Sequence, residues 1–357
     1  MRVEALRESM VQSNIDGFVI SNRKNIFYLT GFMDIAGAAL HLLVPLDGDA
    51  TLLTKPLSFT AASESARNCD VQAIGIKEKM VDRLLLEMRT HRISRLCFDD
   101  LAISTYVALG RSLSEASLTQ RQELIWALRR TKDECEIMSI REAAKLADVG
   151  VETGIEAIKP GVREYEVAAE LEYAMRIRGS KGTAFETVIA SGSRSALPHG
   201  ICGDRVIREG DLVVLDLGAI YGEYRSDITR TVVAGTPSPK QLRMLHIVAE
   251  TQDTAFSQIH AGRPTRDVDA VARGILAGEG YDRYFIHGLG HGVGLDIHEP
   301  PTLSPQSREV LEPGNVVTVE PGIYIADFGG VRIEDTICVN EATGEKLTKA
   351  SYHLPEK

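Results

Sequence analysis

The chain has 357 residues, of which 44% are hydrophobic and 25% are charged, and its formal net charge is −10 at pH 7. This composition is ordinary for a globular protein of about two domains, and the acidic balance argues against nucleic acid as the main partner, because phosphate binding requires a basic surface. No apolar run reaches the roughly 18 residues of a membrane span, so we expect no membrane association.

The first 125 residues alternate between helical and strand-like patterns. The chain opens on a charged amphipathic helix at Met1 and not on a signal peptide. Strand-like runs follow at residues 17–20, 39–44, 50–54 and 95–98, and helical periodicity covers residues 77–91. These patterns predict a small α/β domain with a mixed sheet over residues 1–125, without a cluster of ligand-type side chains.

The chain changes character at a charged run over residues 128–134, which opens a long helix. We therefore predict a second domain over residues 126–357, built of long helices followed by strand pairs. Part of this domain repeats at an offset of 101 residues, since Gly161, Val167, Ala169 and Gly179 match Gly262, Val268, Ala270 and Gly280. The repeat predicts two helix-plus-hairpin halves around a pseudo-two-fold axis, with His199 and His298 facing each other across a cleft.

Five ligand-type side chains of the second domain stand in strand-like or glycine-rich contexts, namely Asp216, Asp227, His291, Glu320 and Glu334. Asp216 and Glu320 interrupt apolar runs, where a carboxylate is costly to bury unless it is paired or bound to a metal. Pairing of the two aspartates with Arg225 or Arg230 is the structural alternative. Four carboxylates and one imidazole on such segments indicate a shared cation, and two cations rather than one.

Hairpin counting brings these carboxylates together in pairs. Counting outward from a two-residue turn at residues 221–222 sets Asp216 opposite Asp227. Counting outward from a loop centred on Asp327 pairs the two glutamates in the same way. Opposed residues on one face of an antiparallel pair have Cβ atoms roughly 4.5–5.5 Å apart. Each pair of carboxylates would therefore repel unless a cation lay between its members.

The five cysteines are scattered, odd in number and never spaced as C-x-x-C: Cys69, Cys97, Cys135, Cys202 and Cys338. This pattern predicts a reduced, cytoplasmic setting. Cys202 follows His199 by three residues, a spacing that would suit a thiol nucleophile next to a base. We interpret Cys202 as a small structural thiol, because no second catalytic partner for it is apparent.

The ligand contexts resemble, in order and spacing, those of the metal-dependent "pita-bread" peptidases, which include prolidase, aminopeptidase P and methionine aminopeptidase. The matching stretches are residues 197–200, 216–231, 290–301, 320–324 and 330–335, within a region from about residue 131 to residue 357. The resemblance implies an α+β fold, with a C-terminal pita-bread domain behind a smaller creatinase/prolidase-like α/β domain. It implies that the five residues that ligate two divalent ions are Asp216, Asp227, His291, Glu320 and Glu334. It also implies that His199 and His298 stand beside them.

Within that family the chain resembles the Xaa-Pro branch, because methionine aminopeptidases usually lack a domain such as residues 1–125 and an arginine such as Arg332. The resemblance implies a homodimeric prolidase, an Xaa-Pro dipeptidase acting on proline-containing dipeptides or short peptides. Aminopeptidase P is the close alternative, and a methionine aminopeptidase or a non-catalytic binding protein of this fold are remote ones. Many relatives carry Asp-x-Arg-Tyr after the second N-terminal hairpin strand, where this chain has residues 53–58 as LTKPLS, so the substrate length stays open.

Oxygen-rich ligands with one imidazole favour Mn²⁺ or Co²⁺, with Fe²⁺ or Zn²⁺ as alternatives, over a closed thiolate zinc site. For hydrolysis we expect Glu320 to accept the proton of the attacking water, His298 to help stabilise the oxyanion, and His199 to help protonate the leaving proline nitrogen. The expected substrate contacts are His199, His298, Tyr324 and Arg332. Core packing is the alternative for Tyr324, and bracing of Glu334 or Asp335 is the alternative for Arg332, which shares a strand face with Glu334.

Overall fold

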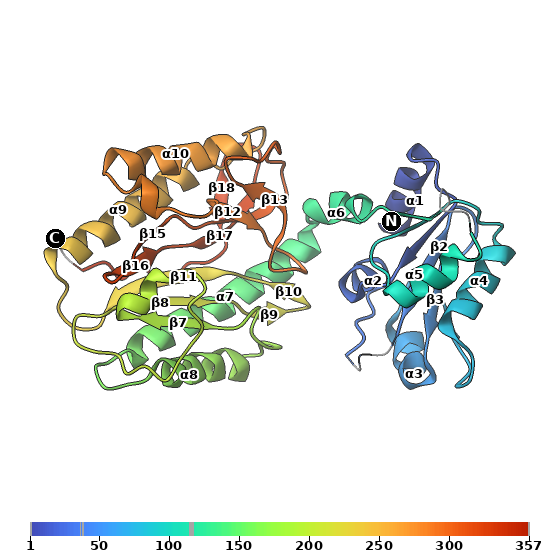
Figure 1. Ribbon diagram of the computed structural model, residues 1–357, viewed down its shortest axis with the longest axis horizontal. Coiled ribbons are helices and arrows are strands. Elements are labelled where there is room, and N and C mark those ends of the chain that lie inside the picture. The colour runs from blue at the N-terminus through green and yellow to red at the C-terminus, as the bar shows by residue number, and fades with distance from the viewer. Residues whose placement is uncertain (1, 36, 38, 114–117, 356–357) are drawn as a thin grey trace. The chain divides into compact units, whose positions relative to one another are not determined.

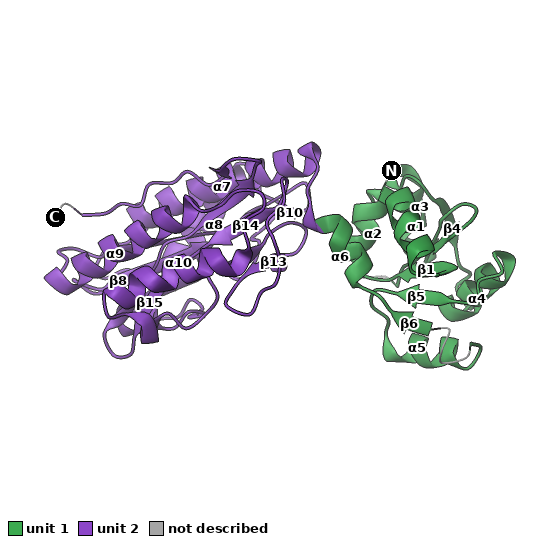
Figure 2. Ribbon diagram, turned by 90° about the horizontal axis from the view of Figure 1, so that it is seen from above, with its two compact units in different colours: residues 1–129 green, residues 130–357 purple. Residues whose placement is uncertain are grey.

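The computed structural model describes residues 2–35, 37, 39–113 and 118–355. They divide into two compact units, residues 1–129 and residues 130–357 (Figure 2). The sequence predicts a boundary after residue 125, whereas the helix α6 (Glu123–Arg130) runs across that position, and the two units divide after residue 129, near the end of this helix. Every helix within the described ranges is too short or too polar to cross a membrane.

The N-terminal unit is a six-stranded mixed sheet with the strand order β4-β3-β2-β1-β5-β6. Its strands are β1 (Gly17–Ile20), β2 (His41–Pro45), β3 (Thr51–Thr54), β4 (Asp70–Ala73), β5 (Leu96–Phe98) and β6 (Leu118–Gln120). Its other helices are α1 (Arg2–Gln12), α2 (Arg23–Thr30), α3 (Pro56–Ser65), α4 (Met80–Thr90) and α5 (Ile103–Gly110). β1 pairs antiparallel with β2 and parallel with β5, which confirms the predicted mixed sheet.

The C-terminal unit combines long helices with several small sheets (Figure 1). Its helices are α7 (Glu134–Ala157), α8 (Glu164–Ile177), α9 (Pro239–Phe256) and α10 (Thr265–Gly278), with 3₁₀ turns η2 (Gly192–Ala196) and η3 (Asp282–Tyr284). One sheet has the order β11-β8-β7, from β7 (Val188–Ser191), β8 (Leu212–Leu217) and β11 (Ile228–Val233). The other has the order β13-β12-β14-β17-β18, from β12 (Gly290–Gly292), β13 (Glu299–Leu303), β14 (Val316–Val319), β17 (Asp335–Val339) and β18 (Gly344–Lys346). Two short hairpins complete it, β9 (Ile220–Tyr221) with β10 (Tyr224–Arg225), and β15 (Gly322–Ile325) with β16 (Gly329–Arg332).

Two hydrophobic cores hold the helices of this unit against its sheets. In one core, α7 and α8 pack on the first sheet, as Val151 does near Leu215. In the other, α9 and α10 pack on the second sheet, as Val248 does near Val317. The helices thus cover the outside of each half, and the strands meet in the middle of the unit (Figure 1).

The predicted repeat at an offset of 101 residues is confirmed. α8 and α10 begin 101 residues apart and end 101 residues apart. In the turns that precede them, the amide of Gly161 donates to the carbonyl of Ile207, and the amide of Gly262 donates to that of Leu311, over 2.9 and 2.8 Å. Both glycines have a positive φ, 100° and 81°. A Cβ at either would meet nothing within 4 Å, so the backbone conformation, and not space, requires glycine there.

The hairpin that joins β8 to β11 differs in register from the predicted one. Its turn lies at Gly222-Glu223, whose φ values are 54° and 72°, and not at residues 221–222. Two consecutive positive φ values are typical of a type I′ turn, which suits the twist of a hairpin. Asp216 consequently lies opposite Thr229, so its predicted pairing with Asp227 is wrong. A shift of two positions leaves the face of the sheet unchanged, because side chains alternate with period two.

The second hairpin has the predicted register. β15 and β16 pair symmetrically around Asp327, which adopts a φ of 61°. β14 and β17 continue the same register further from the turn. Glu320 and Glu334 therefore stand opposite each other in the gap between the two ladders.

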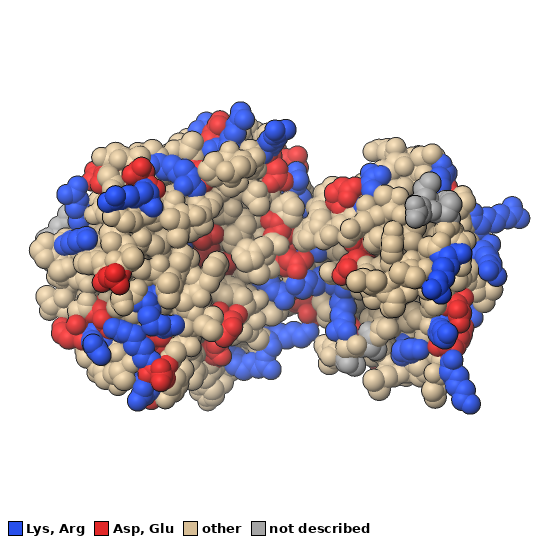
Figure 3. Space-filling view, viewed as in Figure 1, with Lys and Arg blue, Asp and Glu red and all other residues tan. Residues whose placement is uncertain are grey.

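The surface of the C-terminal unit carries charges of both signs. On the face that Figure 3 shows, Lys and Arg are interspersed with Asp and Glu over this unit. This face offers no continuous basic stripe of the kind that a phosphate backbone needs.

Candidate metal centre

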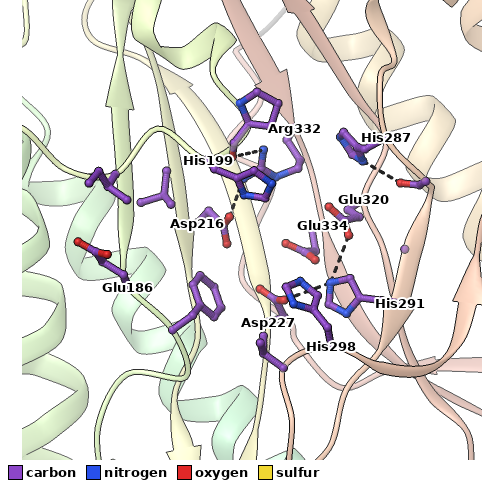
Figure 4. Close-up of a pocket in the computed structure, with 17 residues that line it drawn as sticks. Glu186, His199, Asp216, Asp227, His287, His291, His298, Glu320, Arg332 and Glu334 are labelled. Carbon is purple, nitrogen blue, oxygen red and sulfur yellow. Dashed lines mark hydrogen bonds and ion pairs between the residues drawn. The ribbon is translucent and has the colours of Figure 1, made fainter.

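A cavity of about 430 Å³ lies in the C-terminal unit and receives side chains from both halves of the repeat. All five candidate ligands line it, together with His199, His298 and Arg332 (Figure 4). The first half contributes the two aspartates, and the second half contributes His291 and the two glutamates. The structure thus brings together the residues that the sequence singled out, from segments that lie far apart along the chain.

The backbone explains why these side chains point inward. Asp227, Glu320 and Glu334 stand where one strand ends and the next begins, so their ladders are interrupted beside the cavity. The amide of Glu334 donates to the carbonyl of Thr229 over 3.0 Å, and this bridge joins the two halves of the repeat. The junction of the halves is therefore the place where the carboxylates converge.

The ligand-type atoms are close enough to share a metal ion. Asp227, His291 and Glu334 each offer an atom within 4.8 Å of the others. The Nε2 atom of His291 lies 3.7 Å from Oδ2 of Asp227 and 3.4 Å from Oε1 of Glu320. Its Nδ1 atom lies 3.1 Å from the carbonyl oxygen of Gly292, a contact that requires the proton on Nδ1. The lone pair of Nε2 then faces the carboxylates.

The electrostatics of the site are unfavourable without a cation. Burial, and then the charges of Glu334, Asp216 and Glu320, raise the pKa of Asp227 well above its ordinary value. Burial, followed by neighbouring carboxylates, likewise raises the pKa of Glu334 far above the ordinary value, and the pKa of Glu320 is raised to about 8, mainly by burial. Burial lowers the pKa of His291 to about 3. The buried Oδ1 of Asp216 has no hydrogen-bond partner among the described residues. Divalent cations fit this donor set, because they pair the charges and use the free oxygen.

These shifts predict that the metal-free protein loses stability as the pH rises. The raised pKa of Glu320 means that the folded state keeps a proton which the unfolded chain releases above pH 4.5, until the folded carboxyl itself titrates at about pH 8. The lowered pKa of His291 acts in the opposite direction, but only below its ordinary value of 6.5. Between pH 6.5 and 8 the contribution of Glu320 alone amounts to about 1–2 kcal/mol. Urea unfolding of chelator-treated protein at these two pH values measures it, and equal stabilities would contradict it.

Arg332 makes its polar contacts within the protein. Its guanidinium donates to Oδ2 of Asp216 over 2.6 Å, to Oγ1 of Thr229 over 3.1 Å and to the hydroxyl of Tyr324 over 2.8 Å. The Thr229 hydroxyl in turn donates to Oε2 of Glu334 over 2.6 Å. Arg332 thus braces one carboxylate directly and another through Thr229. These hydrogen bonds support the alternative in which Arg332 braces a carboxylate of the site and does not contact the substrate. The carboxylate that it contacts directly is that of Asp216.

Tyr324 lies behind the cavity wall, and it does not appear among the described residues that line the cavity. Its hydroxyl accepts from Arg332 and lies 2.9 Å from Nε2 of His287. Nδ1 of His287 lies 2.7 Å from the carbonyl of Gly288, so the Tyr324 hydroxyl donates to Nε2. Both capacities of the hydroxyl are used inside the protein, which supports a packing role. The sequence analysis missed His287, because no sequence pattern indicates this residue, which lies in a bend before β12 and lines the same cavity as His291.

His199 and His298 both point into the cavity (Figure 4). The ring of His298 stands edge-on to that of His291, with centroids 4.3 Å apart and an interplanar angle of 70°. Burial, and then the nearby His199, lower the pKa of His298. A neutral imidazole, that of His298, is therefore available beside the carboxylate cluster.

Two structural interpretations are decided by these contacts. Arg230 pairs with Asp335 over 2.8 Å, and Arg225 donates to backbone carbonyls, so the alternative pairing of the site's aspartates with these arginines is wrong.

The thiol of Cys202 donates to the carbonyl of Thr187 over 2.9 Å, and burial raises its pKa to about 11. The interpretation of Cys202 as a structural thiol is confirmed.

Comparisons with known proteins agree with this geometry over the whole chain. Residues 138–341 match metallopeptidase family M24, and residues 2–131 match the creatinase/prolidase N-terminal domain. The chain is 40% identical over 354 residues to the Xaa-Pro dipeptidase of Pyrococcus furiosus, and the match covers 99% of each chain. The crystal structure of the prolidase from Pyrococcus horikoshii OT3 is similar with a TM-score of 0.93 at 39% identity, covering 99% of both chains. An X-Pro aminopeptidase from Thermotoga maritima MSB8 is similar with a TM-score of 0.89 at 32% identity, covering 98% of both chains.

Proposed function

Because the chain belongs to metallopeptidase family M24, and is thereby a metal-dependent hydrolase, we propose that it is an Xaa-Pro dipeptidase, a prolidase that hydrolyses the bond before proline in dipeptides. The observation that carries this proposal is the single cavity in which four carboxylates and His291 meet beside His199 and His298. The similarity to an X-Pro aminopeptidase over 98% of the chain keeps that activity as the second candidate.

The metal centre of the proposal consists of two divalent ions held by Asp216, Asp227, His291, Glu320 and Glu334. Mn²⁺ or Co²⁺ suits this oxygen-rich set, with Fe²⁺ or Zn²⁺ as alternatives. When bound, such ions supply Lewis-acid polarisation of the scissile carbonyl and make water acidic enough to react near neutral pH. Arg332 and Thr229 hold two of the carboxylates in place, as the hydrogen bonds to Asp216 and Glu334 support.

The remaining side chains move or hold protons. Glu320 accepts the proton of the attacking water, because its carboxylate lines the cavity in which the water and the substrate would lie. His298, whose lowered pKa keeps it neutral at pH 7, donates a hydrogen bond to the developing oxyanion. His199 delivers a proton to the leaving proline nitrogen, which carries no hydrogen of its own in the tertiary amide. The substrate contacts that the proposal retains are His199 and His298, while Arg332 supports the site from the cavity wall and Tyr324 supports it from behind that wall.

A homodimer in the cytoplasm completes the proposal. All five cysteines are free in the structure, which supports a reducing setting. Light scattering on the purified protein tests the dimer.

The decisive experiment is a paired hydrolysis assay on Mn²⁺-loaded protein with Ala-Pro, Ala-Pro-Ala and Ala-Ala. We expect cleavage of Ala-Pro, with Ala-Ala hydrolysed at least about 100-fold more slowly, because a site shaped for the tertiary amide leaves the extra N–H of Ala-Ala unpaired. Asp227→Ala, which removes a proposed ligand, is the inactive control. Preferred cleavage of Ala-Pro-Ala would make the protein an aminopeptidase, and cleavage of neither proline peptide would contradict the Xaa-Pro assignment.

A further inference from the structure

A buried ion pair lies behind the cavity wall, outside the metal centre. Nζ of Lys132 lies 2.6 Å from Oε1 of Glu299, and each side chain is only 1% exposed. Removing two charges from water costs several kcal/mol per ion, so such a pair adds little to stability compared with apolar residues of similar size. Stability therefore does not explain why this ion pair lies next to His298.

The pair connects two segments of the C-terminal unit. Lys132 precedes α7, and its backbone amide donates to the carbonyl of Gly314 over 2.9 Å, which fixes its position. Glu299 is the first residue of β13 and follows His298 directly. The Glu299 carboxylate also accepts from the amide of Asp296 over 3.3 Å. The carboxylate is thus tied to a fixed lysine on one side and to the loop that leads to His298 on the other.

The glycines of this loop make room for Glu299. A Cβ on Gly294 would lie 2.4 Å from Oε1 of Glu299, and a Cβ on Gly292 would lie 2.4 Å from its carbonyl oxygen. A side chain at position 292 would clash with backbone that cannot move away, and a side chain at position 294 would push the Glu299 carboxylate out of its contact with Lys132. Both glycines are therefore needed for the observed position of Glu299. The loop from His291 to His298 is folded tightly around this one side chain.

The side chain of Glu299 is buried against Lys132, whereas the adjoining His298, in the bend just before β13, lines the cavity. We propose that the Lys132–Glu299 ion pair is a positioning device for His298, an inference that rests on the proposed function. By holding the Glu299 carboxylate, Lys132 fixes the backbone next to His298, and so keeps the ring of His298 edge-on to His291 and directed at the scissile carbonyl. Lys132 and Glu299 touch neither substrate nor metal, and they act only through His298.

A thermodynamic cycle with His298 tests this role. The double variant Lys132→Met/Glu299→Gln replaces the pair by neutral side chains, so that no buried charge is left alone and the protein folds. We expect it to lower kcat/KM for Ala-Pro by about 10–100-fold, mainly through kcat, with an unchanged Mn²⁺ content. In a His298→Ala background the same two substitutions should change kcat/KM by less than about 2-fold. An equal loss in both backgrounds would show that the pair does not act through His298.

A control separates positioning from loss of stability. Leu171→Ala creates a cavity in the fully buried core of α8, far along the chain from this loop, and should lower the unfolding midpoint while leaving kcat/KM unchanged. If Leu171→Ala lowers kcat/KM as much as the double variant does, the effect is one of stability and the inference fails.

A structural measurement keeps the inference independent of the substrate. The crystal structure of Lys132→Met/Glu299→Gln should show the His298 ring displaced from its 4.3 Å contact with His291. An undisturbed ring would overturn the inference even if the enzyme is a prolidase. Conversely, failure of the wild type to cleave any Xaa-Pro substrate would refute the proposed function, while a displaced His298 ring in the variant would still support the device.

Discussion

Asp227→Asn abolishes hydrolysis and yet makes the metal-free protein more stable. Asparagine matches aspartate in shape but lacks the negative charge that a cation between Asp227, His291 and Glu334 requires. We therefore expect loss of stoichiometric metal and a fall in kcat/KM of about 10⁴-fold, the scale seen when one member of a catalytic unit is removed. In the metal-free state the same negative charge destabilises the folded protein, because burial and three neighbouring carboxylates raise the pKa of Asp227. Its removal should add about 1–2 kcal/mol of stability.

Thermal unfolding in excess chelator at pH 8, together with metal analysis, measures both effects. Asp335→Asn is the matched control, since Asp335 is equally buried but paired with Arg230 over 2.8 Å, so its neutralisation should destabilise the protein. The opposite signs of the two changes distinguish a metal ligand from a structural carboxylate. A less stable metal-free Asp227→Asn protein, or one that retains its full metal content, would refute this assignment.

Arg332→Lys has the second largest expected effect, and it acts on the metal. Lysine keeps the positive charge but cannot reach Asp216, Thr229 and Tyr324 at once with one ammonium group. We expect Mn²⁺ affinity to fall by about 10–100-fold, with a similar loss of kcat. Arg332→Met should in addition cost about 3–5 kcal/mol of stability, because it leaves the buried partner of a charged pair uncompensated.

Calorimetric titration with Mn²⁺, followed by kinetics at saturating metal, distinguishes the two roles considered for Arg332. A brace for Asp216 weakens metal binding, whereas a clamp for the substrate carboxylate raises KM and leaves metal affinity intact. Tyr324→Phe provides the control, since it removes one hydroxyl of the same network and keeps the Arg332–Asp216 contact, so its effect on metal affinity should be smaller. A raised KM with unchanged Mn²⁺ affinity in Arg332→Lys would contradict the bracing role.

The sequence was informative where local context determines position. The loop centred on Asp327 predicts the register that sets Glu320 against Glu334, because the turn and both flanking ladders lie within one short stretch. The partner predicted for Asp216 was wrong because the turn includes Glu223, whose φ is 72°. A positive φ is uncommon for glutamate, so the residue type does not indicate a turn at this position. The carboxylate stayed on the correct face only because the error was even.

No local sequence pattern could predict the contacts that support the side chains of the site. The hydroxyl of Thr229 donates to Glu334 across the junction of the two halves, and Lys132, near the start of the C-terminal unit, pairs with Glu299, which lies far from it along the chain. Each of these contacts depends on tertiary packing of segments that no short motif relates. Arg332 was expected to contact the substrate, and the bracing role proposed for it depends on its hydrogen bond to Asp216, which no local sequence pattern indicates.

The most direct test of the metal centre is a Mn²⁺ titration of chelator-stripped protein in which bound metal per chain and Ala-Pro hydrolysis are recorded together. We expect two bound ions per chain, no activity without metal, and activity that saturates when both ions are bound. Full activity in the chelator-stripped protein, or saturation without stoichiometric metal in the cluster of four carboxylates and His291, would contradict this prediction.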